Sequence, residues 1–92
     1  MNEQAAAQAV NFAILTAHRL GEPRVLELSS SRLRELRCGG KPGDFSGGPP
    51  WTYRGLRLCE VEGVGGRVLA WDRAREMEVV QPIRWPADQA RA

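Results

Sequence analysis

The clearest alternation of apolar and polar side chains lies over residues 51–71, and it predicts two strands joined by a glycine-rich turn. Successive residues of an extended chain point to opposite faces of a sheet, so Trp51 and Tyr53 would share one face. Leu56 has the opposite parity. Either a bulge at Gly55 returns these residues to one face, or the strand is central and covered on both faces. Both interpretations make this strand internal.

The end of the chain continues the strand pattern. Residues 62–66 supply glycines for a reversal, residues 67–71 alternate in side-chain direction, and residues 76–80 alternate charge with bulk. The last pattern is typical of a strand with one face in water. Consecutive strands joined by short turns predict an antiparallel meander.

The first half of the chain favours helices. Apolar side chains at helical spacing, such as Val10 and Ile14, predict a helix over residues 3–20, and Gly21 followed by Pro23 ends it.

A second helical segment follows a short strand. Residues 24–28 are expected to form the strand and residues 32–37 the helix, with Leu33 and Leu36 facing inward. The serines at 29–31 are favoured N-caps, because a serine hydroxyl accepts a hydrogen bond from a free amide of the first turn.

The predicted fold class is therefore α+β: an N-terminal helix, a short strand and a short helix packed on a small antiparallel meander of three to four strands. The length of 92 residues suits a single domain over residues 1–87. A loop rich in glycine and proline occupies residues 38–50, and residues 88–92 are expected to be disordered.

Composition agrees with a globular domain, because 42% of the residues are hydrophobic and 26% are charged. Cys38 and Cys59 belong to no paired Cys or His motif, and His18 is the only histidine, so we expect neither zinc nor another cofactor. The sequence shows no secretory signal, and its N-terminal apolar run is too short to span a bilayer. We expect a cytoplasmic location.

The residues form no catalytic constellation. His18 is expected to be a helix-end residue, and the serines have no base placed to activate them. Lys41 is followed by Pro42 and not by Ser or Thr, so the nearby glycines do not make a phosphate loop. We therefore expect a protein that is not an enzyme and has no small-molecule substrate.

The aromatic residues make a protein partner or self-association the first functional hypothesis. Trp85 lies between prolines and is either an anchor of the core, which we favour, or an exposed aromatic that meets a partner. The candidate partner-binding residues are Phe45, Trp51, Tyr53 and Trp85.

The alternative hypothesis is a regulatory protein that binds nucleic acid. Residues 19–41 hold an excess of arginine and lysine over glutamate, although the net charge of the whole chain is only +2. The candidate polyanion-binding residues are Arg32, Arg34, Arg37 and Lys41.

Residues 24–72 resemble a local unit in the major coat proteins of tailed phages. The resemblance lies in Arg-Val-Leu-Glu-Leu-Ser-Ser-Ser-Arg-Leu-Arg-Glu-Leu, a glycine-rich gap, then Tyr-Arg-Gly-Leu-Arg-Leu-Cys-Glu-Val and Gly-Gly-Arg-Val-Leu-Ala-Trp-Asp. It implies a strand, a short helix, a loop and two further strands. The chain is far too short for a whole coat subunit. The resemblance therefore implies a small assembly protein of a phage or mobile element, located in the host cytoplasm or the virion.

Overall fold

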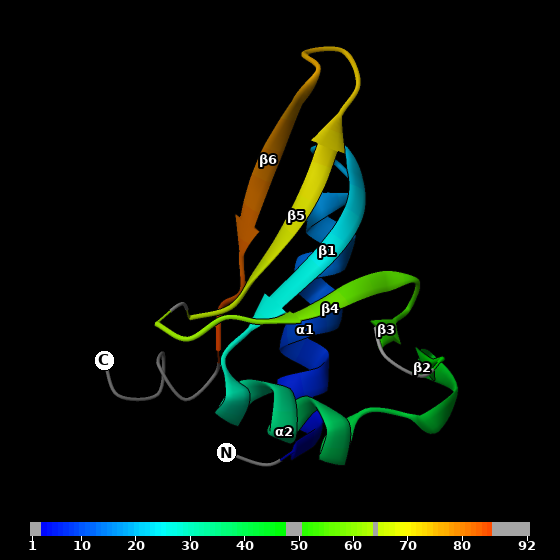
Figure 1. Ribbon diagram of the computed structural model, residues 1–92, viewed down its shortest axis with the longest axis vertical. Helices are drawn as coiled ribbons and strands as arrows, with labels where there is room; N and C mark the ends of the chain where they lie inside the picture. Colours follow the sequence, from blue (N-terminus) through cyan, green and yellow to red (C-terminus); the bar gives the residue numbers. More distant parts are fainter. Residues whose placement is uncertain (1–2, 48–50, 64, 86–92) are drawn as a thin grey trace.

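The computed structural model describes residues 3–47, 51–63 and 65–85, and it arranges them as two helices packed on one mixed sheet (Figure 1). This confirms the α+β class. In chain order the elements are α1 (Glu3–Ala17), β1 (Glu22–Leu28), α2 (Ser30–Gly39), the 3-10 turn η1 (Pro42–Asp44), β2 (Phe45–Ser46), β3 (Thr52–Tyr53), β4 (Leu56–Glu60), β5 (Arg67–Asp72) and β6 (Met77–Pro82).

The sheet has six strands in the order β2-β3-β4-β1-β5-β6, so the predicted meander of three to four strands is wrong. Strand β1 lies between β4 and β5 and runs parallel to β4, whereas every other neighbouring pair is antiparallel. The reason is that α2 carries the chain away from β1 before β4 forms, which allows a parallel pair. The connection from β4 to β5 then passes the end of β1, where the Val61 amide donates to the Leu28 carbonyl at 2.8 Å.

The change of parity at Gly55 comes from a hairpin and not from a bulge or a strand covered on both faces. Arg54 and Gly55 have φ values of 49° and 83°. Two consecutive residues with positive φ form the tight turn that best matches the twist of an antiparallel pair. Strand β4 lies between β3 and β1, so the expectation of an internal strand is confirmed.

Both predicted helices are present with shifted bounds. Helix α1 ends at Ala17, three residues earlier than predicted, and α2 extends over Ser30–Gly39. Ser29 is the N-cap of α2, because its hydroxyl accepts from the Arg32 amide at 3.4 Å. The predicted loop over residues 38–50 contains the end of α2, the turn η1 and the short strand β2.

The core lies between the helices and one face of the sheet. Small residues such as Ala6 and Ala13 let α1 approach the sheet closely, while α2 contributes Leu33 and Leu36 as expected. Burying each leucine side chain contributes roughly 1.5 to 3 kcal/mol. The sheet supplies Leu26, Leu28, Tyr53, Leu56, Val68 and Ala70 to the same cluster.

Trp85 closes one end of this core. Its side chain is only 2% exposed, its indole Nε1 donates to the Gly65 carbonyl, and the Arg32 guanidinium lies 4.4 Å from the ring centroid. This environment agrees with the anchor interpretation. The predicted end of the domain at residue 87 and the predicted disorder of residues 88–92 lie outside the described residues.

Gly66 is packed against Trp85 with no room for a side chain. Its φ is +110°, and a Cβ atom there would lie 2.8 Å from Trp85 Cζ2 and 3.3 Å from Ile83 Cδ1. We predict that Gly66→Ala destabilises the fold by about 2 kcal/mol or more, through strain and a displaced indole. Thermal unfolding should show a melting temperature lower by roughly 10 °C. Gly65→Ala is the matched control, because a Cβ there meets nothing within 4 Å. Equal melting of the two variants would contradict the packing argument.

Glu62, in the connection between β4 and β5, holds the N-terminus of α2. Its Oε1 accepts a hydrogen bond from the Ser30 amide at 3.0 Å. Hydrogen bonds from the Ser30 backbone and then from its side chain lower the pKa of Glu62 below its ordinary value of 4.5, because they favour the charged carboxylate.

We predict that Glu62→Gln lowers the melting temperature at neutral pH and has less effect in acid. A carboxyl group with a lowered pKa stabilises the fold above its unfolded pKa, and this stabilisation disappears as pH falls through the folded pKa. Melting curves between pH 7 and pH 3 should therefore converge for the two proteins. Glu60→Gln removes the same charge from an exposed residue with no hydrogen bond to α2 among the described residues. A constant difference across this pH range would argue against the hydrogen bond.

Candidate functional site

The sheet has one face without a helix. The buried side chains of β1 and β5 (Leu26, Leu28, Val68 and Ala70) belong to the cluster that includes α1 and α2. Alternate residues of the same strands point to the opposite side. The molecule measures 38 × 37 × 22 Å, and its shortest dimension suits two layers, since packed layers lie roughly 10 Å apart. Among the described residues, no element covers this second face.

The strand register shows which residues share this face. Arg57 pairs with Val25, Val25 with Leu69, and Leu69 with Val80, which makes one row across β4, β1, β5 and β6. A second row holds Cys59, Glu27 and Arg67, and a third holds Glu22, Trp71 and Glu78. We call these ten residues the uncovered face: Glu22, Val25, Glu27, Arg57, Cys59, Arg67, Leu69, Trp71, Glu78 and Val80.

The uncovered face combines an apolar strip with paired charges. Val25, Leu69 and Trp71 are half-buried, while Val80 is 48% exposed. Arg67 Nε lies 2.5 Å from Glu27 Oε1.

The indole of Trp71 is covered from one side by a neighbouring arginine. The Arg24 guanidinium lies 5.5 Å from the centroid of the Trp71 ring and 3.6 Å from the Glu22 carboxylate. A surface of this kind suits another protein surface, because it offers apolar area within a frame of charges of both signs.

A groove of about 290 Å³ lies where α1 passes the outermost strand, β6. Phe12 on its helix side is 70% exposed, which is unusual for a phenylalanine. We call this the α1–β6 groove; its lining residues are Ala9, Phe12, Ala13, Thr16, Arg19, Gln81, Pro82 and Arg84.

The predicted polyanion-binding residues are only partly together. Arg34, Arg37 and Lys41 are exposed on or just after α2, and the Arg37 guanidinium lies 5.6 Å from the ring centroid of Trp51. Arg32 is half-buried, where it contacts Trp85 and pairs with Glu35 at 3.4 Å. We call Arg34, Arg37 and Lys41, with Trp51, the basic face.

The predicted partner-binding aromatics are dispersed. Trp51 is 44% exposed, whereas Tyr53 and Trp85 are buried. Phe45 packs edge-on against Tyr53 with ring centroids 5.0 Å apart. The Tyr53 hydroxyl donates to Asn11 Oδ1 at 2.6 Å, and burial raises the pKa of this tyrosine. These contacts make Phe45 and Tyr53 part of the packing between the sheet and the helices.

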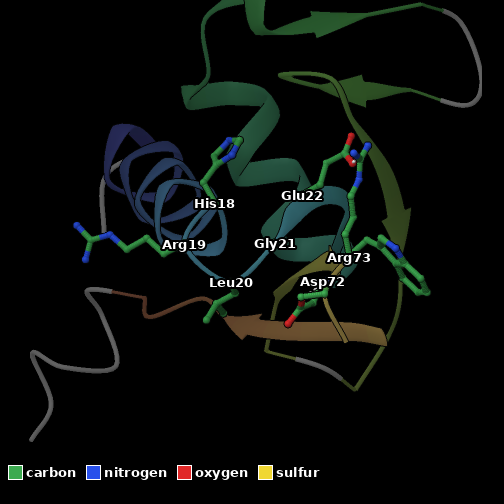
Figure 2. Close-up of a pocket in the computed structure, with 9 residues that line it drawn as sticks. His18, Arg19, Leu20, Gly21, Glu22, Asp72 and Arg73 are labelled. Atoms are coloured by element: carbon green, nitrogen blue, oxygen red, sulfur yellow. Dashed lines mark hydrogen bonds and ion pairs between the residues drawn. The ribbon is translucent and has the colours of Figure 1, made fainter. Parts of the chain in front are cut away.

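A wide cleft of about 510 Å³ lies where α1 turns into β1 beside the end of β5 (Figure 2). Figure 2 shows Arg19 pointing away from the other labelled side chains, while Glu22 and Arg73 lie side by side. Their charged groups are 3.7 Å apart. Asp72 accepts hydrogen bonds from the amides of Ala74 and Arg75, so its carboxylate closes the β5–β6 turn. The acidic groups of this cleft are thus engaged in ion pairs and a turn.

Other kinds of site have little support in the described part of the chain. No group of three or more His, Cys, Asp or Glu residues there is placed to hold a metal ion. Cys38 is exposed, Cys59 is half-buried, and both are free thiols. Neither described helix combines the length and apolar character needed to cross a membrane.

The uncovered face could not be recognised from the sequence, because its rows depend on which strands are neighbours. The alternation of residues 67–71 separated Val68 and Ala70 from Leu69 and Trp71 correctly. Nothing in that alternation placed Val25 beside Leu69. The signal that was available is the order strand, helix, strand over residues 22–60, which favours a parallel pair with other strands outside it.

Comparison with known proteins gave no match of any kind. No family model, no curated protein sequence and no solved structure matches this chain. The function is therefore inferred from the geometry of the surfaces described above.

Proposed function

We propose that this chain is a small, non-enzymatic interaction module that binds a protein partner through its uncovered face. The observation that carries the proposal is the apolar strip of Val25, Leu69, Trp71 and Val80 on a side of the sheet that no described helix covers. A one-sided antiparallel sheet in contact with water usually presents polar residues on the wet side. Large apolar side chains at these positions favour a surface that is covered by a partner.

The charges around the strip favour a protein over a nucleic acid as the partner. Three arginines and three glutamates border it, and they offset one another: Arg24, Arg57 and Arg67 against Glu22, Glu27 and Glu78. A phosphate backbone would favour a surplus of arginine or lysine at the contact. The chemistry suits a protein surface with an apolar ridge bordered by both signs of charge.

The resemblance of residues 24–72 to a unit of phage coat proteins supports a more specific proposal. The module would serve assembly in a phage or mobile element and act in the host cytoplasm or the virion. Strand β1, helix α2 and strands β4 and β5 follow one another in the order that the resemblance implies, with the short strands β2 and β3 between α2 and β4.

We predict that Leu69→Lys weakens binding of the protein partner at least tenfold, because it places a charge in the centre of the strip. A tenfold change corresponds to about 1.4 kcal/mol, which is ordinary for a central interface residue. The partner would be identified by mass spectrometry after co-purification with the tagged chain from its host, and its affinity for purified variants measured by calorimetry.

The double variant Arg34→Gln/Lys41→Gln is the control for this experiment, because it alters the basic face and leaves the uncovered face intact. Melting curves of both variants would show that they remain folded. Retained binding by Leu69→Lys would contradict the use of the uncovered face.

The second candidate function is binding of a nucleic acid at the basic face. Exposed Trp51 beside Arg37 favours it, because base stacking on an aromatic next to a cation is common in single-strand binders. Arg34, Arg37 and Lys41 make no ion pair among the described residues, so they are available to phosphates.

We expect this second function to show steep salt dependence. Affinity for a mixed-sequence single-stranded oligonucleotide should fall when salt rises from 50 to 200 mM, about tenfold or more for three phosphate contacts. Fluorescence anisotropy would measure it. Arg34→Gln/Lys41→Gln should reduce both the affinity and the salt slope, while Leu69→Lys should leave them unchanged. If no binding is measured at 50 mM salt, the nucleic-acid function is contradicted and only the protein-binding function remains.

A further inference from the structure

We propose that a second copy of this chain adds its strand β6 to the free edge of β6, antiparallel, with the two-fold axis at Val80. This edge is a second binding surface, separate from the uncovered face. The inference rests on the proposed function only in one respect, namely that the chain is a binding module. Figure 1 shows β6 at the rim of the sheet, with no described strand beyond it.

The register shows which backbone groups of β6 are unpaired. The Ile83 amide donates to the Gly66 carbonyl at 3.0 Å, so the backbone groups of Ile83 point toward β5. Backbone groups alternate in direction along a strand. The amide and carbonyl of Glu78 and Val80 therefore point away from the sheet. Pro82 has the same direction, but it presents only a carbonyl.

Pairing centred on Val80 uses these groups well. The two Val80 residues exchange both backbone hydrogen bonds, and the Glu78 amide donates to the carbonyl of Pro82 of the partner subunit. The proline therefore removes one donor per chain without blocking the pairing. Val80, which is 48% exposed, gains an apolar contact with Val80 of the partner subunit.

The same register matches opposite charges. It brings Glu76, which ends the turn before β6 and has a φ of 52°, toward Arg84 of the partner subunit, just beyond the end of that subunit's β6. Both residues are exposed, and neither forms an ion pair among the described residues. Opposite charges at facing positions stabilise a strand pair, whereas like charges destabilise it.

The neighbouring registers match less well in hydrogen bonds or in charge. An axis at Gln81 would set Glu78 opposite Arg84 of the partner subunit, but within β6 it would pair Val80 only with Pro82, which has no amide to donate. An axis at Glu78 would set Glu78 against its own copy. An axis at Val79 would set Arg84 opposite Ala74, between the exposed Arg73 and Arg75. Two glutamates would face each other with the axis at Glu78, and arginines would lie near one another with the axis at Val79.

The pairing also covers an exposed methionine beside the α1–β6 groove. Met77 has the parity of Val79, which packs against the core, so Met77 lies on the helix side of the sheet and is 47% exposed. The proposed register sets it opposite Ile83 of the partner subunit, next to the groove that Phe12 lines. The exposed Met77 side chain of each chain would then be covered by the other chain, as apolar side chains are in a homodimer interface.

Sedimentation velocity of the full chain tests the proposal. The wild-type protein should form a dimer at tens of micromolar, as expected of a small interface, with a dissociation constant on the order of 10 μM. Glu76→Arg and Arg84→Glu should each raise that constant about tenfold or more, because each variant dimer contains two pairs of like charges, one on each side of the axis. An equimolar mixture of the two variants should recover a dimer of wild-type affinity, since every facing pair is then opposite in charge. A merely structural defect in either variant would not be repaired by mixing.

Val80→Pro gives an independent check on the pairing. It removes an amide that points away from β5, so the fold should keep its melting temperature within a few degrees while the dimer is lost. A wild-type monomer at 1 mM would overturn the proposal, and so would a dimer that survives Val80→Pro. A dimer that is lost in Leu69→Lys but unchanged by the charge reversals would assign self-association to the uncovered face and overturn the edge pairing. The dimer assay needs no host partner, so its outcome is separate from that of the co-purification experiment.

Discussion

The arrangement depends on the backbone pairing of β1 with strands on both of its sides. Strand β1 is parallel to β4 and antiparallel to β5, which makes it the bridge between the β2-β3-β4 half and the β5-β6 half of the sheet. Its alternate residues Leu26 and Leu28 are fully buried toward the helices, so its pairing also fixes the position of the core. The same register brings Val25 and Glu27 onto the opposite face. The position of the core and the composition of the uncovered face therefore both depend on the pairing of β1.

Local signals in the sequence predicted the local structure well. Ser29 capped α2, Leu33 and Leu36 turned inward, and Trp85 entered the core, because each outcome depends on capping chemistry or on the burial of a large apolar side chain. The strand segments were also recognised from alternation, apart from the short strand β2 and the separation of β3 from β4. Arg54 explains the latter error, since a non-glycine residue with positive φ gives little warning of a turn.

Long-range order was not available from the same signals. The meander was predicted because strands close in sequence usually pair, and here β1 intervened between β4 and β5. Without the strand order, the exposure of the candidate site residues could not be predicted either. Of the predicted partner-binding aromatics, only Trp51 is well exposed. Of the predicted polyanion-binding residues, Arg32 is engaged in contacts with Trp85 and Glu35. The uncovered face could be recognised only when strands distant in sequence were placed side by side.

The unequal lengths of the two outer strands limit how the molecule can assemble. Strand β6 has six residues, whereas β2, at the other end of the sheet, has two and offers almost no template for a further chain. A sheet that could extend at both ends would grow into a filament, as exposed edges do in aggregation. If β6 pairs with its own copy as proposed, no second long edge is left for further growth. The geometry therefore favours a closed particle of defined size over an open polymer.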